Sequence, residues 1–409
     1  MPKTTERIFR LLEKYLKDNG LPMNDENVKR FMEDYNAHLS QYQEPQDDID
    51  RSIDCYEKAL EAKNKNQKRA LLQQALELWP DNLDAFTELV RVNSKTPAEA
   101  LSRLLEKERE WDKRYHDEGL LPKEEGDFYF INETRPYMRL LFDIFTHYRF
   151  TQEFDKAIAM GEKIIRLNRN DNLGVRFQLS GLYLLTDNEK GFAALWKKYR
   201  SIDNPFYHAD KYIQAVLKGN KSLITRYMNE LYYSNLALYL FFNERRLEYL
   251  DFIISEDSYQ AGSLEEAFVY IDEHAELLRR KEIESLPVST VGPQELFLNL
   301  ESTLGLLVAN YYAVQSGREE FKKSQVITYL QGTSPDLIRE LQPTYGLCDG
   351  MRKNEVFNLI IKPLEEMGYL RLLDNGNYYL TPRGRVAVVY LTLHADEMDP
   401  SGDSHLPKA

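Results

Sequence analysis

The stretch from Glu133 to Leu173 constrains the fold most, because its apolar residues recur at the spacing of an α-helix. The first set is Leu141, Ile144, Phe145 and Tyr148, and the second is Phe154, Ala157, Ile158, Gly161, Ile164 and Ile165. An Asn-Arg-Asn-Asp-Asn turn at 168–172 follows, whose side chains can cap the next helix. Two antiparallel helices of this kind bury little apolar surface alone and form a core by stacking. The pattern therefore predicts a helical repeat protein.

Composition limits the class of protein further. A chain of 409 residues is too long for one compact core, which suggests two or three units unless a solenoid spreads it out. No apolar run reaches about 18 residues, and the N-terminus is charged, so we expect neither a membrane span nor a secretion signal. Cys55 and Cys348 lie far apart without a CxxC pair, which argues against a disulfide framework or a zinc site. These features predict a cytoplasmic protein.

The body of the chain reads as successive helices. Residues 1–44 predict an N-terminal helical cap, with helices at about 4–18 and 25–40 around a breaker at 19–22. Residues 45–285 predict helical pairs. Their expected helices are about 49–62, 66–78, 82–93, 97–112, 172–185, 189–199, 206–217, 221–229, 233–242, 245–255 and 263–282, beside the pair already described. Thr96 is expected to cap a helix that has Pro97 in its first turn.

The segment 119–132 interrupts this period with Pro122, Gly126 and an aromatic cluster at 128–130. Long loops in a stacked array are often functional, because they gather on one face. The alternative is that these aromatic side chains pack against the following helices.

Composition changes at 286–293, and residues 293–393 predict a separate small module. Helices are expected at about 294–315, 321–331, 335–341 and 352–367. Short β-prone runs then flank an Asn375-Gly376 turn, which predicts a hairpin. Helices followed by a hairpin that closes on Thr381 to Arg385 resemble a winged-helix domain. The polar tail, 394–409, is predicted to be disordered.

The segments 133–139, 170–176 and 261–270 resemble a family of tetratricopeptide proteins related to the suppressor-of-tumorigenicity-7 group and its bacterial homologues. The resemblance covers about 130–275 and implies helical pairs that display a binding surface without chemistry of their own. In such repeats a small residue on the first helix faces a large aromatic on the second. Here Phe145 and Gly161 exchange these roles, with the summed volume roughly kept. Arg169 departs from the pattern, since a proline is common before the turn.

The resemblance implies that residues of the first helix in each pair line the partner-binding face. The candidates are Asn132, Arg135, Tyr137, Arg139, Asn172, Arg176 and Gln178. Arg135 and Arg139 lie one helical turn apart and could hold a carboxylate of the partner. The alternative is internal pairing of these arginines with Glu133 and Asp171.

A winged helix would suggest DNA binding through the helix before the hairpin and through the wing. The basic and polar candidates are Arg352, Lys353, Asn354, Arg371, Arg383 and Arg385. They form a thin basic face, because the same helix carries Glu355 and Glu366, and Pro363 would kink it. Residues 318–391 hold ten Lys and Arg against nine Asp and Glu, so the net charge of −13 belongs to the helical body.

No catalytic or metal-binding motif is found in the sequence. The seven histidines show no HExxH spacing, and no glycine-rich phosphate loop or GxSxG elbow occurs. His208 with Asp210, and Asp272 with His274, come nearest to acid/base clusters, and both are expected on solvated helix surface. We therefore expect no enzyme activity, no cofactor and no metal.

The sequence thus predicts a mainly α fold: a tetratricopeptide-like α-solenoid with a small C-terminal winged-helix-like α+β module. The predicted function is that of a non-catalytic intracellular adaptor that binds a protein or peptide. The alternative is a transcriptional regulator, in which the repeats sense a partner and the winged helix contacts DNA. A third hypothesis is an accessory subunit of an enzyme. The sequence leaves the oligomeric state open.

Overall fold

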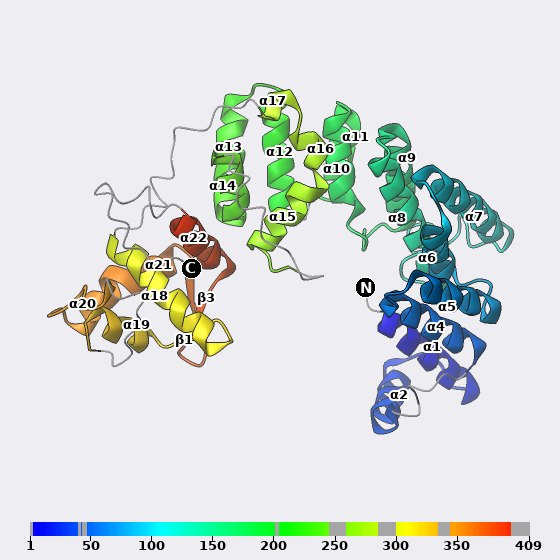
Figure 1. The fold of residues 1–409 in the computed structure, drawn as a ribbon, viewed down its shortest axis with the longest axis horizontal. Helices are drawn as coiled ribbons and strands as arrows, with labels where there is room; N and C mark the ends of the chain where they lie inside the picture. Colours follow the sequence, from blue (N-terminus) through cyan, green and yellow to red (C-terminus); the bar gives the residue numbers. More distant parts are fainter. Residues whose placement is uncertain are drawn as a thin grey trace. The chain divides into compact units, whose positions relative to one another are not determined.

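The protein is mainly helical (Figure 1). The computed structural model describes residues 3–39, 42, 47–200, 204–244, 259–284, 300–333 and 344–393. The chain divides into two compact units, Met1–Thr186 and Asp187–Ala409. Among the described residues, no helix combines the length and the apolar content needed to cross a bilayer.

The first unit is a succession of helices that pack on their neighbours in sequence. They are α1 (Lys3–Asp18), α2 (Asp25–Ala37), α4 (Asp48–Glu61), α5 (Lys65–Leu78), α6 (Leu83–Asn93), α7 (Pro97–Asp117), α8 (Arg135–Phe150), α9 (Phe154–Leu167) and α10 (Val175–Leu185). The expected helix bounds are confirmed to within a few residues, apart from α7, which extends five residues beyond the expected end at 112. Thr96 caps α7 as predicted, because its hydroxyl accepts the Glu99 N–H at 3.2 Å.

Each helix of the first unit contacts the next from α4 to α10, and α6 also contacts α8. Figure 1 shows α4 beside α5 and α8 beside α9. The cap formed by α1 and α2 has a small core of its own around Phe31, whose side chain is fully buried. Burial of apolar faces between neighbouring helices therefore holds the unit together along its length.

The predicted exchange of a large and a small residue between α8 and α9 is confirmed. A Cβ atom on Gly161 would lie 3.1 Å from Cε2 of Phe145 and 3.2 Å from Cδ1 of Leu179. Phe145 is fully buried in this contact. The absence of a side chain at position 161 therefore lets the Phe145 ring lie between α8, α9 and α10.

The loop at 119–132 is fixed to the end of α9. The Phe128 N–H donates to the Leu167 carbonyl at 3.1 Å, and the Arg169 N–H donates to the Gly126 carbonyl at 3.0 Å. Phe128 and Tyr129 are buried, whereas 55% of Phe130 is exposed. The packing interpretation of this aromatic cluster is therefore correct for two of its three members.

The second unit begins with further helices. They are α11 (Glu189–Lys198), α12 (Pro205–Leu217), α13 (Lys221–Ser234), α14 (Leu236–Glu244), α15 (Leu264–Glu273), α16 (Ala275–Leu278) and α17 (Lys281–Glu284). The single helix expected at 263–282 is wrong, because the chain leaves helical geometry at His274 with φ −112° and ψ 15°. The helix expected at 245–255 and the boundary expected at 286–293 lie outside the described residues.

The C-terminal elements follow in the order helix, strand, helix, helix, strand, strand, helix. They are α18 (Leu300–Ser316), β1 (Glu320–Phe321), α19 (Lys323–Leu330), the continuous helix of α20 (Lys353–Val356), η4 (Phe357–Ile361) and α21 (Lys362–Glu366), then β2 (Leu370–Leu372), β3 (Tyr378–Leu380) and α22 (Pro382–Leu393). The antiparallel sheet has the order β1-β3-β2. The predicted hairpin is confirmed, whereas β1 and α22 were not expected. The helix expected at 335–341 and the tail at 394–409 lie outside the described residues.

The helix at 353–366 is regular except for a π-helical stretch, Phe357–Ile361, that ends two residues before Pro363. Proline supplies no N–H, and a π-turn shifts the hydrogen-bond pattern so that the helix continues past it. The helix also lies close to α18, because a Cβ on Gly305 would lie 2.2 Å from Cγ2 of Ile360.

We expect Gly161→Val to lower the free energy of unfolding by about 1–3 kcal/mol, because the added carbons overlap the Phe145 ring. Phe145→Leu should cost less in the Gly161→Val background than in the natural chain. Denaturant unfolding of both single variants and the double variant would measure this coupling, which we expect to be about 1 kcal/mol. Ala159→Val, at an exposed position on the same helix, controls for the β-branched side chain. Equal destabilisation by Gly161→Val and Ala159→Val would contradict the packing argument.

Candidate binding cavity in the first unit

The first unit contains a cavity of about 620 Å³ between helix ends that are distant in sequence. Its walls come from α1, α4, the start of α6, the end of α7 and the segment 131–136 that leads into α8. The lining residues are Glu6, Arg7, Arg10, Glu13, Ile49, Ile53, Tyr56, Trp79, Asp81, Asn82, Leu83, Asp84, Trp111, Arg114, Tyr115, Glu118, Leu120, Ile131, Asn132, Glu133, Thr134 and Pro136. This volume lies in the range of sites that hold small molecules or short peptide segments.

Aromatic side chains form much of the apolar wall. Two of the three tryptophans of the chain, Trp79 and Trp111, line the cavity together with Tyr56 and Tyr115. The rings of Trp111 and Tyr115 lie 5.4 Å apart, and the guanidinium of Arg114 lies 4.6 Å from the Trp111 ring. Rigid aromatic walls beside polar groups are typical of binding sites, since they offer contact area at low cost in conformational entropy.

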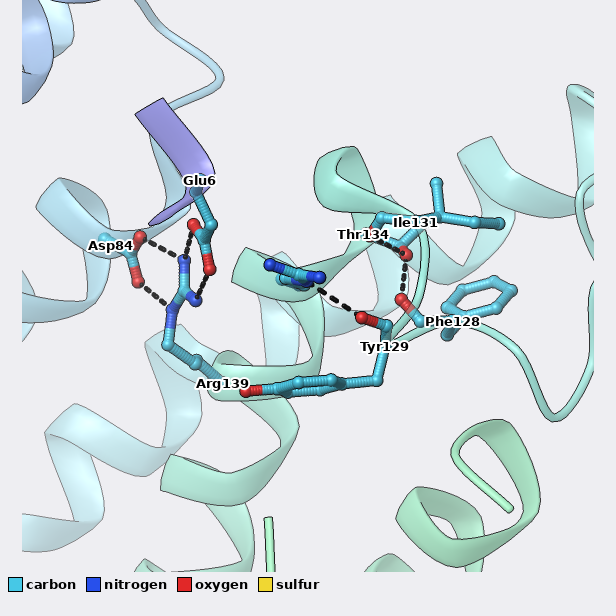
Figure 2. A network of polar contacts seen from close by, with 8 residues as sticks. Glu6, Asp84, Phe128, Tyr129, Ile131, Thr134 and Arg139 are labelled. Carbon is cyan, nitrogen blue, oxygen red and sulfur yellow. Dashed lines mark hydrogen bonds and ion pairs between the residues drawn. The ribbon is translucent and has the colours of Figure 1, made fainter. Parts of the chain in front are cut away.

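Arg139 holds two walls of this region together. Its Nη1 and Nη2 donate to Glu6 at 2.6 and 3.0 Å, and its Nε and Nη2 donate to Asp84 at 2.8 and 2.7 Å (Figure 2). Glu6 lies on α1, Asp84 on α6 and Arg139 on α8. Burial alone would lower the pKa of Arg139, but the bonds to Asp84 and Glu6 outweigh it and raise that pKa above its usual value.

The arginines in the cavity wall are also bound by carboxylates. Arg7 pairs with Asp54 at 3.0 Å, Arg10 with Asp47 at 3.2 Å and with Asp50, and Arg114 with Asp81 at 2.8 Å and Glu118 at 2.9 Å. Each guanidinium charge in the wall is therefore compensated within the protein.

Glu13 and Glu133 are different: both residues are exposed, and neither side chain has a hydrogen bond or an ion pair within the described part of the chain. Desolvation raises the pKa of Glu13, and the nearby charge of Glu133 raises it further. Asn132 lines the same cavity, and its Oδ1 is buried without a hydrogen-bond partner among the described residues. In the described structure, the unpaired groups of the wall therefore include two carboxylates, an amide oxygen and one donor, the buried Nε of Arg10.

The predicted partner-binding residues divide into several environments. Asn132 lines the cavity. The Nε of Arg135 donates to the Tyr129 carbonyl at 2.8 Å, and its guanidinium lies 5.3 Å from the Tyr129 ring. Figure 2 shows this loop carbonyl beside the start of α8. Tyr137 is fully buried and donates to Asp112 at 3.0 Å, so it belongs to the core. Arg139 is occupied by internal carboxylates, as described above.

The remaining predicted residues do not line the cavity. Asn172 is exposed, and Arg176 pairs with Asp171 at 3.0 Å. Gln178 is buried and accepts a hydrogen bond from Arg149. The expected pairing of Arg135 and Arg139 with Glu133 and Asp171 is not found among the described residues. Arg139 is bound by Glu6 and Asp84, and Asp171 pairs with Arg176 instead.

The basic residues of the C-terminal elements also differ in their surroundings. Arg352, Lys353 and Asn354 are exposed at the start of the helix at 353–366, and the exposed Arg371 lies 5.2 Å from the Tyr379 ring. Arg385 pairs with Glu319.

Arg383 serves packing within the second unit. Its guanidinium lies 4.5 Å from the Tyr232 ring and 5.5 Å from the Tyr369 ring. Its Nε donates to the Met367 carbonyl at 3.1 Å, and Nη1 donates to the Tyr232 carbonyl. Arg383 therefore links the start of α22 to the end of α13.

The expectation that the two His/Asp clusters lie on solvated helix surface is wrong, because three of their four residues are buried. Asp210 is fully buried, and the exposed fractions of His208 and His274 are 7% and 2%. The Tyr270 hydroxyl donates to Asp210 Oδ1 at 2.9 Å, and His274 Nε2 lies 3.2 Å from the same oxygen. All three side chains of this cluster, Asp210, Tyr270 and His274, are buried, so its geometry suits a polar contact between α12 and the end of α15.

Comparison with known proteins finds no matching family model and no matching curated protein. Sequence reasoning missed Glu6, Glu13, Trp79 and Trp111 as members of the cavity. Their signal was weak, because acidic and aromatic residues at single helix positions are common and the partners lie more than a hundred residues apart in the case of Glu6 and Arg139.

We expect Glu13→Gln to raise the melting temperature at pH 7 and to leave it unchanged at about pH 3. A carboxyl whose pKa is raised by folding loses stability as the pH rises from its unfolded pKa through its folded pKa. Removing the charge restores that loss, by about 0.2–1 kcal/mol because the side chain is partly solvated. Glu33→Gln, at an exposed position on α2 outside the cavity wall, is the control. An equal effect of Glu13→Gln at both pH values would contradict the electrostatic cause.

Proposed function

We propose that the protein is a non-catalytic adaptor that binds a segment of another protein in the cavity of the first unit. The observation that carries the proposal is the 620 Å³ cavity, whose wall combines Trp79, Trp111, Tyr56 and Tyr115 with uncompensated hydrogen-bond acceptors. Antiparallel helices connected by short turns, as in α4 with α5 and α8 with α9, support a tetratricopeptide-like architecture. Such architectures present extended surfaces to chain segments rather than reactive groups.

The chemistry of the wall also favours binding over catalysis. Its arginines are bound by internal carboxylates, and the cluster of Asp210, Tyr270 and His274 elsewhere is buried. Within the described residues, no group of three or more His, Cys, Asp or Glu is placed to hold a metal ion. Cys55 and Cys348 are both free thiols, which suits the reducing interior of a cell.

Site-specific photo-crosslinking in the native cell tests this function. A photo-reactive amino acid in place of Leu120, in the cavity wall, should give a discrete adduct with one partner protein. The same amino acid in place of Leu60, which is exposed on α4, is the control. We expect the adduct from position 120 to disappear in a chain that also carries Trp79→Ala, because the aromatic wall supplies much of the contact.

Equal adducts from positions 60 and 120 would mean that the cavity is not the binding site. A chain that gives no adduct from position 120, while it stays folded by circular dichroism, would overturn the adaptor function.

A second function is supported by the C-terminal elements. We propose that residues 300–393 form a winged-helix-like module, because the order of helices and strands and the sheet order β1-β3-β2 suit that fold. The helix at 353–366 then corresponds to the helix that enters the major groove, and it presents Arg352, Lys353 and Asn354 to solvent at its start. A transcriptional regulator is the resulting alternative to the adaptor.

DNA binding is tested with the double variant Arg352→Ala, Lys353→Ala. If the alternative holds, the chain should bind duplex DNA with an affinity that falls steeply with salt, and this variant should reduce the salt slope by about 2. Lys190→Ala with Lys221→Ala removes the same charge from exposed positions elsewhere in the second unit. Arg383 and Arg385 are unsuitable for this test, because their loss removes internal contacts. Equal losses in the two double variants, or no binding at low salt, would rule the alternative out.

A further inference from the structure

The charge balance of the cavity wall determines which ligands it can accept. The arginines Arg7, Arg10, Arg114 and Arg139 each contact at least one carboxylate. Arg10, Arg114 and Arg139 each contact two carboxylates. Carboxylates therefore outnumber guanidinium groups around the cavity even before Glu13 and Glu133 are considered. An anionic ligand would meet excess negative charge rather than an open arginine fork.

Glu13 and Glu133 concentrate this excess at one place. Glu13 lies on α1, and Glu133 lies in the segment that leads into α8. Both line the cavity, and the charge of Glu133 reaches Glu13 strongly enough to contribute to its raised pKa. Two carboxylates that repel each other across a cavity are relieved by a cation placed between them.

Among the described residues, the unpaired buried groups of the wall include a donor, the Nε of Arg10, and an acceptor, the side-chain oxygen of Asn132. The Oδ1 of Asn132, next to Glu133 in sequence, is buried without a hydrogen-bond partner in the described structure. A buried oxygen without a donor costs free energy that a ligand N–H would recover. Lysine ammonium and arginine guanidinium supply several N–H donors together with a positive charge.

We propose that the bound segment is basic, and that a lysine or arginine side chain of the partner lies between Glu13 and Glu133 in the cavity. The proposal rests on the adaptor function above and names the charge of its partner. Trp79 and Trp111 would accept the aliphatic stem of this side chain and the apolar neighbours of the basic residue. It reverses the expectation that Arg135 and Arg139 would hold a partner carboxylate, because Arg139 is already occupied by Glu6 and Asp84.

A series of blocked heptapeptides that differ only in the central residue tests the sign of the charge. The peptides are acetyl-Gly-Ser-Leu-X-Leu-Ser-Gly-amide, with X as lysine, arginine, glutamine or glutamate. Binding is followed by the indole N–H signals in NMR spectra of the full chain labelled at tryptophan. Trp79 and Trp111 report on the cavity, and Trp196, in the second unit, is an internal control. n-Butylammonium alone is the probe for a small amine.

We expect the dissociation constants of the lysine and arginine peptides, measured from the Trp79 and Trp111 signals, to be at least about tenfold lower than that of the glutamine peptide. The preference should weaken with salt and disappear in Glu13→Gln, Glu133→Gln. The matched double variant Glu33→Gln, Glu61→Gln removes the same charge from exposed positions on α2 and α4 and should keep the preference.

The outcomes separate the two proposals. If the glutamine or glutamate peptide binds as tightly as the lysine peptide, the cavity still binds peptides, but the proposal that the bound segment is basic is wrong. Butylammonium that binds as tightly as the lysine peptide would identify a free amine, rather than a protein segment, as the ligand. If no peptide shifts the cavity tryptophans at millimolar concentration, both the basic segment and the peptide-binding function fail.

Discussion

The paired contacts of Arg139 with Glu6 and Asp84 are the interaction on which the cavity of the first unit depends. It joins α1 to α8 through Glu6, which is 133 positions away, and α6 to α8 through Asp84, which is 55 positions away. Breaking a well-formed buried ion pair by removing one partner costs about 3–5 kcal/mol, because the other charge is left without compensation. Only 23% of the Arg139 side chain is exposed, so most of that cost applies here. This contact, together with the ion pairs of Arg7 and Arg10 to residues 47–54, fixes α1 and with it the wall that carries Glu13.

Because the arginines around the cavity form ion pairs within the protein, their charges are not available to a ligand. Once Arg139 and Arg114 are satisfied by internal carboxylates, the charge still available in the cavity is negative. Folding gains nothing from Glu13 beside Glu133, since desolvation and mutual repulsion disfavour the ionised form of Glu13.

Local physical chemistry in the sequence predicted much of the helical architecture. Helical spacing located α8 and α9, Thr96 marked the start of α7, and the Asn375-Gly376 pair marked the hairpin. Elements without a local signal were missed: β1 has two residues and exists by pairing with β3, and the helix ends at His274, whose buried side chain lies 3.2 Å from Asp210 on α12. The cavity was missed for a related reason. Which of its charged side chains are paired depends on contacts between α1, α6 and α8, and no short window of sequence contains these contacts.

The second unit shows why residue type alone did not identify the sites. Arg383 was a candidate for DNA binding because it is basic and follows a hairpin, yet its guanidinium lies between the Tyr232 and Tyr369 rings and donates to two backbone carbonyls. Asp210 resembled half of an acid/base pair, yet its oxygen accepts the Tyr270 hydroxyl in a fully buried contact. A charged side chain can act on a partner only if the protein leaves its charge uncompensated. Glu13 and Glu133 meet that condition in the cavity of the first unit, whereas Arg139 and Arg383 do not.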